Sequence, residues 1–221
     1  MAPRPRHPRP PKKTLEEHVK EQAEFLDGKL KPRLEEAQQG KRHVFFVGAA
    51  HMVYGTFLCC LWSFVRRYVR AASGRQRFNV LGAIKAVSRE LIAVTNTTVV
   101  NTATMCELLH KLAAQGLVGP VTLVLDNARY QHNEAVKALA VSLNIELLFL
   151  PGYSPNLNLI ERLWRFIKRE ALYGRYHANF ADFKAAIEGV IDQMPSKHKD
   201  KLASLLTLNF QVFDTVSLLA A

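Results

Sequence analysis

Cysteine is scarce in this chain, and its spacing excludes two common uses of the residue. Only three cysteines occur among 221 residues: Cys59, Cys60 and Cys106. None has the C-x-x-C spacing of a zinc site or a redox motif, and the odd count argues against a disulfide framework. This usage is typical of a reducing compartment, so we expect a cytoplasmic protein.

Long apolar runs are also missing. No apolar stretch of the sequence approaches the ~18–20 residues that a membrane helix needs, so no membrane partner is expected. Residues 1–13, MAPRPRHPRPPKK, are basic and rich in proline. No apolar segment follows them, and a secretory signal is therefore not predicted.

Acidic residues are few, and one long stretch has none. The chain carries 19 Asp and Glu against 30 Lys and Arg, which gives a formal net charge of +11 and a pI of about 9.8. From Ala37 through Arg89 there is neither Asp nor Glu. A basic balance of this size favours a polyanionic partner, most commonly nucleic acid, over the alternative of a basic protein without one.

Apolar patterning predicts an α/β domain. With 48% hydrophobic residues a packed core is expected. Strands are predicted at 43–52, 77–87, 90–95, 120–125 and 145–150, with one or two more β segments in 55–75. Helices are predicted at 102–115, 133–143, 159–173 and 179–194. Residues 14–40 are predicted to form a charged helical linker or a docking helix, broken near Gly28 and Pro32. Three consecutive strands followed by βαβ crossovers imply a mixed sheet flanked by helices.

Two acidic residues stand where such a fold places its chemistry. Asp126 directly follows a buried strand, at the carboxyl end where open α/β sheets bind ligands. A lone aspartate there often only caps a loop. Glu161 lies in the first turn of the helix that follows the loop GYSPNLN. The alternative for that segment is an ordinary amphipathic helix with a charged solvent face.

The stretches LVLDNARYQHN and LPGYSPNLNLIERLWRFIK closely resemble the catalytic core of DDE transposases, in the insertion-sequence branch of the Tc/mariner supergroup. Asp126 and Glu161 fall on the second and third acidic positions of that family, with 34 residues between them. Leu159 stands where many members have proline. The resemblance spans residues 41–183 and implies a ribonuclease-H-like fold, with a mixed five-stranded sheet flanked by helices and extra C-terminal helices.

The resemblance also implies chemistry, partners and a domain division. Such enzymes cleave and join DNA strands with two Mg²⁺ or Mn²⁺ ions held by carboxylates, roughly 3.5–4 Å apart. Asp126 and Glu161 would be both catalytic residues and metal ligands. Double-stranded DNA, a homodimer and a DNA-associated, cytoplasmic location in a prokaryote are expected. The expected parts are a basic tail and helical linker at 1–40, the catalytic domain at 41–185 and a helical extension at 186–221.

The first acidic position of the family is not acidic here. The family places an aspartate at the end of the first strand, and this chain reads Phe46-Val47-Gly48-Ala49-Ala50-His51. Gly48 therefore occupies the aspartate position. His51 is a poor substitute, because a neutral imidazole does not suit a hard Mg²⁺ ion, and we interpret it as a packing or supporting residue.

Other residues are weaker candidates. Arg75 and Arg77, near the RRYVR run at 66–70, fit a phosphate-contacting stripe, although a solvated edge explains them equally well. Lys168 and Arg169 are candidate contacts to backbone phosphates. The remaining residues are interpreted as supporting ones. Asn127 would hold its loop or a metal-bound water, and Asn158 would fix the turn before Glu161. Tyr153, Ser154 and Pro155 would shape the loop, with DNA contact as the alternative, and Trp62 and Trp164 would lie in the core.

Two functions of different classes follow. The first is a DDE transposase catalytic domain, impaired in metal binding and strand cleavage because Gly48 removes a shared ligand. The second is a noncatalytic DNA-binding protein that keeps the fold and interferes with active copies by mixed assembly. An unrelated nuclease acting on RNA hybrids fits the fold but not the SPNLNLIE signature. The 40 residues before the first strand are too few for the family's helix-turn-helix region, so a split or truncated gene is expected.

Overall fold

The computed structural model describes residues 15–55, 57 and 73–211. Several sequence-based expectations lie outside these residues. They concern the tail at 1–13, the β segments within 58–72, Trp62, the arginines of 66–70, Cys59 and Cys60.

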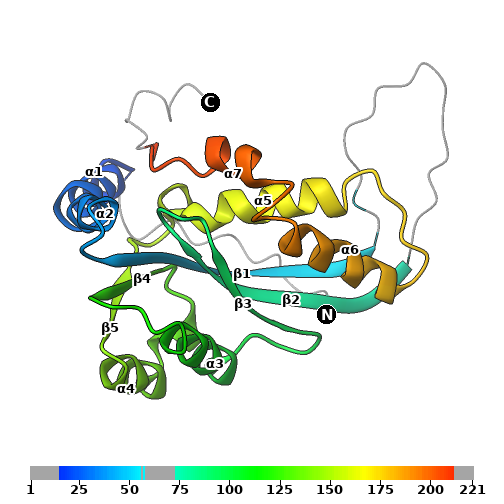
Figure 1. The fold of residues 1–221 in the computed structure, drawn as a ribbon, viewed down its shortest axis with the longest axis horizontal. Helices are drawn as coiled ribbons and strands as arrows, with labels where there is room; N and C mark the ends of the chain where they lie inside the picture. Colours follow the sequence, from blue (N-terminus) through cyan, green and yellow to red (C-terminus); the bar gives the residue numbers. More distant parts are fainter. Residues whose placement is uncertain (1–14, 56, 58–72, 212–221) are drawn as a thin grey trace, which may run out of the picture.

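A five-stranded mixed sheet forms the centre of the chain (Figure 1). Its strands are β1 (His43–Gly55), β2 (Ser73–Lys85), β3 (Leu91–Asn96), β4 (Val121–Leu125) and β5 (Ile145–Phe149). They lie in the order β3-β2-β1-β4-β5, with β1–β2 and β2–β3 antiparallel, and β1–β4 and β4–β5 parallel. The predicted sheet, with three consecutive antiparallel strands and then βαβ crossovers, is confirmed.

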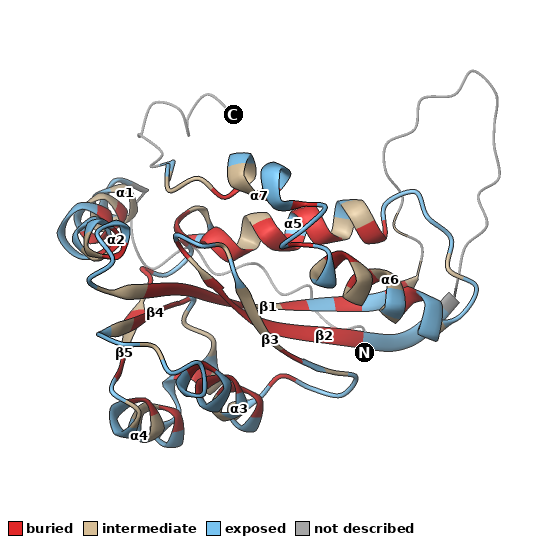
Figure 2. Cartoon of the chain, in the orientation of Figure 1, coloured by how far each residue is buried: buried red, intermediate tan, exposed pale blue. Residues whose placement is uncertain are grey.

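Helices cover both faces of this sheet. α3 (Thr102–Ala113) and α4 (Glu134–Ser142) pack on one face, while α5 (Leu159–Ala171) crosses the other beside α6 (Phe180–Asp192) and α7 (Lys199–Leu205), as Figure 1 shows. The residues of β1 alternate between the two cores, because successive side chains of a strand point to opposite faces. Phe46 and Ala50 join the cluster under α5, whereas Phe45 and Val47 join the cluster under α3. Figure 2 shows buried residues along the central strands and on the helices that pack against them.

The N-terminal helical segment is continuous, so the predicted breaks at Gly28 and Pro32 are wrong. α1 (Leu15–Phe25) runs through a π-helical turn (Leu26–Leu30) into α2 (Lys31–Gln38). At the junction the backbone N–H of Lys31 donates to the carbonyl of Leu26, five residues back. This wider turn accommodates Pro32, which lacks an N–H and would clash with a carbonyl in a regular α-helix.

This helical segment also shares the core of the domain. Its buried side chains Phe25, Leu26, Leu30, Leu34 and Ala37 belong to the same hydrophobic cluster as α5. The boundary expected at residue 40 stays a prediction, but the segment before it packs against the sheet rather than standing apart.

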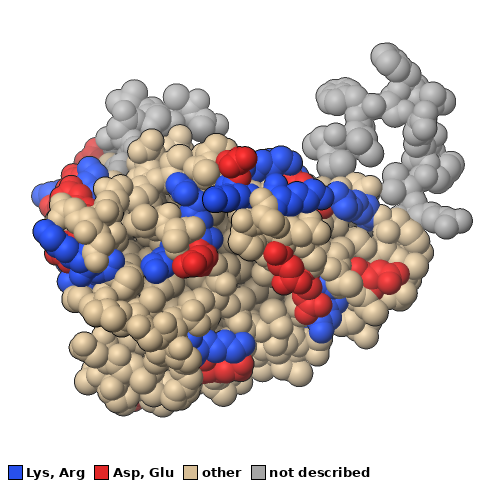
Figure 3. Space-filling view, in the orientation of Figure 1, with Lys and Arg blue, Asp and Glu red and all other residues tan. Residues whose placement is uncertain are grey.

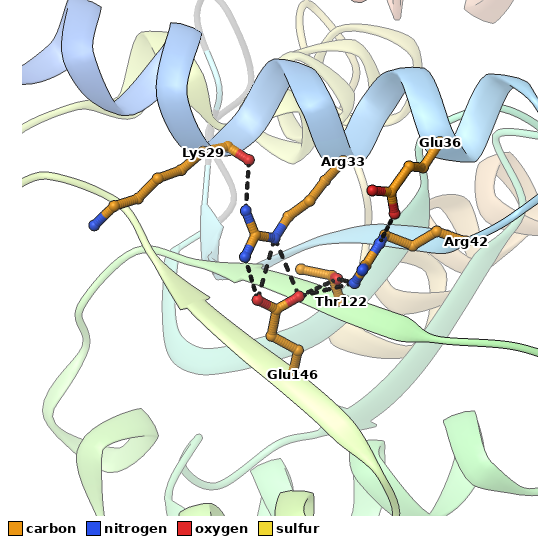
Figure 4. A network of polar contacts seen from close by, with 6 residues as sticks. All are labelled: Lys29, Arg33, Glu36, Arg42, Thr122 and Glu146. Carbon is orange, nitrogen blue, oxygen red and sulfur yellow. Dashed lines mark hydrogen bonds and ion pairs between the residues drawn. The ribbon is translucent and has the colours of Figure 1, made fainter.

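A polar network ties α2 to the start of β4 and β5 (Figure 4). Glu146 accepts hydrogen bonds from Arg33, from Arg42 at 2.9 Å and from the hydroxyl of Thr122 at 2.7 Å. Arg42 also donates to Glu36 at 2.5 Å. The hydrogen bond from Arg33, assisted by Thr122 and by the positive charges of both arginines, lowers the pKa of Glu146 to about 2.

Glu146 is expected to make folding sensitive to acid. Its folded-state pKa lies below the ordinary value of 4.5, so its stabilisation is present above that value and is lost as the pH falls toward about 2. Urea unfolding between pH ~5 and ~3 should therefore show a flatter loss of stability in Glu146→Gln than in the wild type. Glu134→Gln, which changes an exposed helix residue, serves as the control. An equal slope in the wild type and in Glu146→Gln would contradict this.

Candidate active site

Asp126 stands at the carboxyl end of β4, as the sequence predicted. β4 is a short buried strand that ends at Leu125, and Asp126 is exposed at the sheet edge. Asn127 turns the chain with a left-handed φ of 70°, which asparagine tolerates better than most residues. Its Nδ2 donates to the carbonyl of Leu150, just past β5, and its Oδ1 lies 3.1 Å from Nε2 of His132. Asn127 therefore joins the ends of the two parallel strands.

Glu161 approaches the same edge from α5. Helix α5 begins at Leu159, and the buried Asn158 before it donates from Nδ2 to the carbonyl of Val47 at 3.1 Å. This bond anchors the start of α5 to β1, one residue before Gly48. The anchor, together with the apolar face of α5, directs the first turn of the helix over the sheet.

The two carboxylates share a cavity and influence each other. Asp126 and Glu161 both line a cavity of about 420 Å³, together with Asn127, Tyr153 and Asn158. Burial raises the pKa of Glu161, and the negative charge of Asp126 raises it further. Lys168 and Arg165 oppose this rise through their positive charges. The sequence-predicted pair is thus brought together, in a setting that favours a neutralising proton or cation.

Gly48 lies on the same face of the sheet, directly below Glu161. A Cβ placed on Gly48 would stand 3.6 Å from Oε1 of Glu161 and 3.5 Å from Nε1 of Trp164. It would also stand 2.6 Å from Cγ2 of Ile160, closer than two carbons can approach. A side chain at position 48 would therefore point at the predicted site, but α5 now fills the space that it would need.

Trp164 explains how α5 comes so close. Gly48 pairs with Gly82 across β1 and β2, so this part of the sheet carries no side chains on the α5 face. A Cβ on Gly82 would meet Cη2 of the Trp164 ring at 2.9 Å. The indole packs on the paired glycines and is only 2% exposed. Its buried Nε1 has no hydrogen-bond partner among the described residues, and it faces Gly48.

His51 cannot replace the missing acid from its position. Because side chains alternate along β1, His51 points to the same face of the sheet as Val47 and Ala49, which pack on the α3 side. Gly48 lies toward the other face, under α5. Its Nδ1 lies 2.8 Å from Oδ1 of Asn79, which itself donates to Asn96 on β3. His51 therefore belongs to a polar chain across the other face of the sheet.

The donor set suits one divalent ion better than two. Carboxylate oxygens such as those of Asp126 and Glu161 are the ligands that Mg²⁺ and Mn²⁺ prefer. Among the described residues, no group of three or more His, Cys, Asp or Glu side chains is placed to hold a metal ion. Gly48 supplies no ligand, and its nearest side-chain neighbours on this face include the Cγ2 methyl of Ile160 and the Nε1 of Trp164, neither of which binds a cation. These residues do not fit a pair of ions bridged by a common carboxylate.

The basic candidates fall into two groups on opposite sides of the sheet. Arg75 and Arg77 are exposed on β2. Because side chains alternate along a strand, they are on the same face of β2 as Leu81, which packs under α3. Lys168 and Arg169 lie in the last turn of α5. Figure 3 shows basic side chains gathered over α5 and α7. The structure therefore does not join the four predicted residues into one surface.

Sequence reasoning underrated two neighbours of Glu161. Arg165 follows Glu161 by four residues, so the two lie on one side of α5. Trp164 was expected in the core, but its contact with Gly48 and Gly82 was not foreseen. A glycine inside a strand pattern, as at position 82, is a signal of close approach by another part of the chain.

A family profile described as DDE superfamily endonuclease matches residues 65–184, more than half of the chain. The chain belongs to this family. The matched DDE segment contains Asp126 and Glu161 and begins after Gly48. The relationship to DDE transposases predicted from the sequence is thereby confirmed. No curated protein sequence matches the chain.

Solved structures show the same fold at low sequence identity. A Mos1 transposase paired-end complex with the left transposon end matches with a TM-score of 0.59 and 14% identity, over 95% of this chain and 68% of that one. A Mos1 mariner paired-end complex with Mn matches with a TM-score of 0.58 and 16% identity, over 96% and 69%. The Mos1 transposase catalytic domain with Raltegravir and Mg matches with a TM-score of 0.56 and 14% identity, over 91% and 100%. The predicted ribonuclease-H-like fold is confirmed.

Within residues 15–55 and 73–211, no helix has the length and apolar character needed to cross a bilayer.

Proposed function

We propose that this chain is a DDE transposase catalytic domain that binds double-stranded DNA but cleaves it weakly or not at all. The observation that carries the proposal is the geometry at Gly48. A Cβ on this residue would stand 3.6 Å from Oε1 of Glu161, yet Gly48 has no carboxylate and Cγ2 of Ile160 lies 2.6 Å from that Cβ position. Family membership and the Mos1 fold support the transposase part of the proposal.

Asp126 and Glu161 would hold a single Mg²⁺ or Mn²⁺ ion in this proposal. A bound ion would supply positive charge to the oxygens of a phosphodiester. The chain's own residues contribute the cavity, the two oxygen ligands, and the loop anchors Asn127 and Asn158. Insertion-sequence origin, a prokaryotic cytoplasm and assembly as a homodimer belong to the same proposal, as does interference with active copies if cleavage is lost.

DNA binding and cleavage are to be measured separately. In the presence of a chelator, the wild type is expected to bind duplex DNA with an affinity that falls steeply as salt is added, because phosphate contacts release counterions. With Mn²⁺, nicking of supercoiled DNA should differ little between the wild type and Asp126→Asn/Glu161→Gln. Robust nicking by the wild type that this double variant loses would contradict the loss of cleavage. Failure to bind duplex DNA would contradict the DNA-binding part.

A further inference from the structure

A second cavity adjoins the acidic one and is not explained by the two carboxylates. It has a volume of about 550 Å³, and its walls come from four separate segments: α1, the loop after β5, α5 and the stretch after α7. Glu161, Tyr153 and Pro155 line both cavities. The two spaces therefore meet at Glu161, with Tyr153 and Pro155 on the rim between them.

Tyr153 has an unusual position on this rim. Its side chain is 92% exposed, although a large aromatic ring gains little from contact with water alone. Its backbone φ is 56°, in the left-handed region that tyrosine rarely adopts. A strained residue of this kind persists only where its surroundings hold it, and such residues concentrate at functional sites.

Contacts from both ends of the chain hold this loop in place. The Nε2 atom of His18 in α1 lies 3.3 Å from the carbonyl oxygen of Tyr153. Asn156 donates from Nδ2 to Oε1 of Gln22 at 2.9 Å and to the carbonyl of Gln211 at 2.7 Å. Gln22 is itself buried. The aromatic ring is thus presented by a braced loop, which reduces the entropy that binding would cost.

Arginines supply the charge of this second cavity. Arg162 donates to the carbonyls of Thr207 at 2.8 Å and Asn209 at 2.7 Å, so it fastens the segment after α7 and is not available to a ligand. Arg165 also lines the cavity and is exposed, and its positive charge acts on Glu161. An exposed guanidinium and an exposed aromatic ring that line one cavity match the phosphate and the base of a nucleotide.

From these contacts we infer that the second cavity binds one unpaired nucleotide of a DNA strand, with its base stacked on Tyr153 and its phosphate at Arg165. The inference rests on the proposed function, because it requires the chain to bind DNA. A duplex cannot place a base on Tyr153 while its own stack is intact, so the nucleotide must be frayed, overhanging or extruded. Because Glu161 lines both cavities, this nucleotide would lie next to the acidic cavity.

Two DNA probes test the inference in the presence of a chelator, so that cleavage plays no part. One is a blunt duplex, and the other is the same duplex with a single overhanging 2-aminopurine nucleotide. The wild type is expected to bind the overhanging DNA about 5-fold or more tighter than the blunt DNA, and to quench its fluorescence by stacking. Tyr153→Phe should keep both effects. Tyr153→Asn should lose both and bind blunt DNA as the wild type does, since asparagine tolerates the left-handed backbone.

Removing one positive charge at two different positions distinguishes a specific phosphate contact at Arg165 from a general attraction of DNA to a basic protein. Arg165→Gln should reduce the preference for the overhanging DNA, whereas Lys137→Gln on α4, which packs on the opposite face of the sheet from α5 and does not line the cavity, should leave it unchanged. A wild type that binds both probes equally would overturn the nucleotide site and leave duplex binding intact. So would a Tyr153→Asn variant with the wild-type preference. Absence of binding to either probe would overturn the proposed function as well.

Discussion

Gly48→Asp is expected to create Mn²⁺- and Mg²⁺-dependent nicking of supercoiled DNA at least about 100-fold above the wild-type rate, equivalent to ~2.7 kcal/mol of activation free energy. The Cβ of the new aspartate would lie 3.6 Å from Oε1 of Glu161, so its carboxylate would stand near that of Glu161. Three carboxylates, with Asp126, would supply the shared ligand that a two-ion site requires. The measurement is the initial nicking rate with each metal and with a chelator.

The structure adds a condition to this gain. The Cβ of residue 48 would lie 2.6 Å from Cγ2 of Ile160, and a β-branched side chain in a helix has little rotamer freedom with which to move away. Gly48→Asp is therefore expected to lower thermal stability. Adding Ile160→Leu removes the Cγ2 methyl at nearly constant volume, so the double variant should recover stability and nick faster than Gly48→Asp alone.

Gly48→Asn is the matched control. It brings nearly the same shape and the same collision with Ile160, without the negative charge that binds a cation. It should lose stability as Gly48→Asp does and gain no nicking. Mn²⁺ should raise the thermal midpoint of Gly48→Asp more than that of the wild type or of Gly48→Asn, because the cation offsets repulsion among the carboxylates. Equal nicking by the wild type and the Gly48→Asp/Ile160→Leu variant would refute the view that Gly48 disables the site.

The order of elements and the acidic pair were accessible from sequence for physical reasons. The strand VTLVL and the amphipathic period of LIERLWRFIKRE are local patterns, and each marks the segment that carries one acid. Convergence of Asp126 and Glu161 then follows from parallel pairing of β4 with β5 and a short return into α5. The number of residues between Asp126 and Glu161 therefore predicts that the two carboxylates lie close together.

Features that depend on packing between distant segments were not accessible. Nothing local shows that Trp164 lies on Gly48 and Gly82, because that contact joins three elements. The continuous helix through Gly28 and Pro32 was missed for a related reason. A π-turn and burial against the sheet outweigh two residues whose intrinsic preference is to end a helix. The second cavity depends on both ends of the described chain meeting one loop, which sequence spacing does not reveal.

Trp164→Ala is expected to cause the largest loss of stability among single substitutions near the site. The side chain is 2% exposed and fills the space between α5 and two strands, so its removal should lower the free energy of unfolding by about 3–5 kcal/mol.

Gly82→Ala should also destabilise, by about 1–3 kcal/mol, since its Cβ would meet a rigid ring atom at 2.9 Å and Cδ1 of Leu91 at 2.9 Å. Urea unfolding of each variant gives these values.

Combining Trp164→Ala with Gly82→Ala tests whether a glycine is needed at position 82 because the indole of Trp164 packs against it. In the Trp164→Ala background the ring is gone, and the close atom that remains, Cδ1 of Leu91 at 2.9 Å, is the end of a flexible side chain that can move into the vacated space, so Gly82→Ala should cost little. The coupling between the sites should then be of the same size as the cost of Gly82→Ala alone, about 1–3 kcal/mol. Gly189→Ala is the control, because a Cβ there meets no atom within 4 Å and should stabilise α6 by about 0.5–1 kcal/mol. Additive effects of Trp164→Ala and Gly82→Ala would mean that the close approach of α5 to Gly48 does not depend on the contact between the Trp164 ring and Gly82. The absence of an aspartate at position 48 and the packing of α5 on the sheet would then be independent features of the chain.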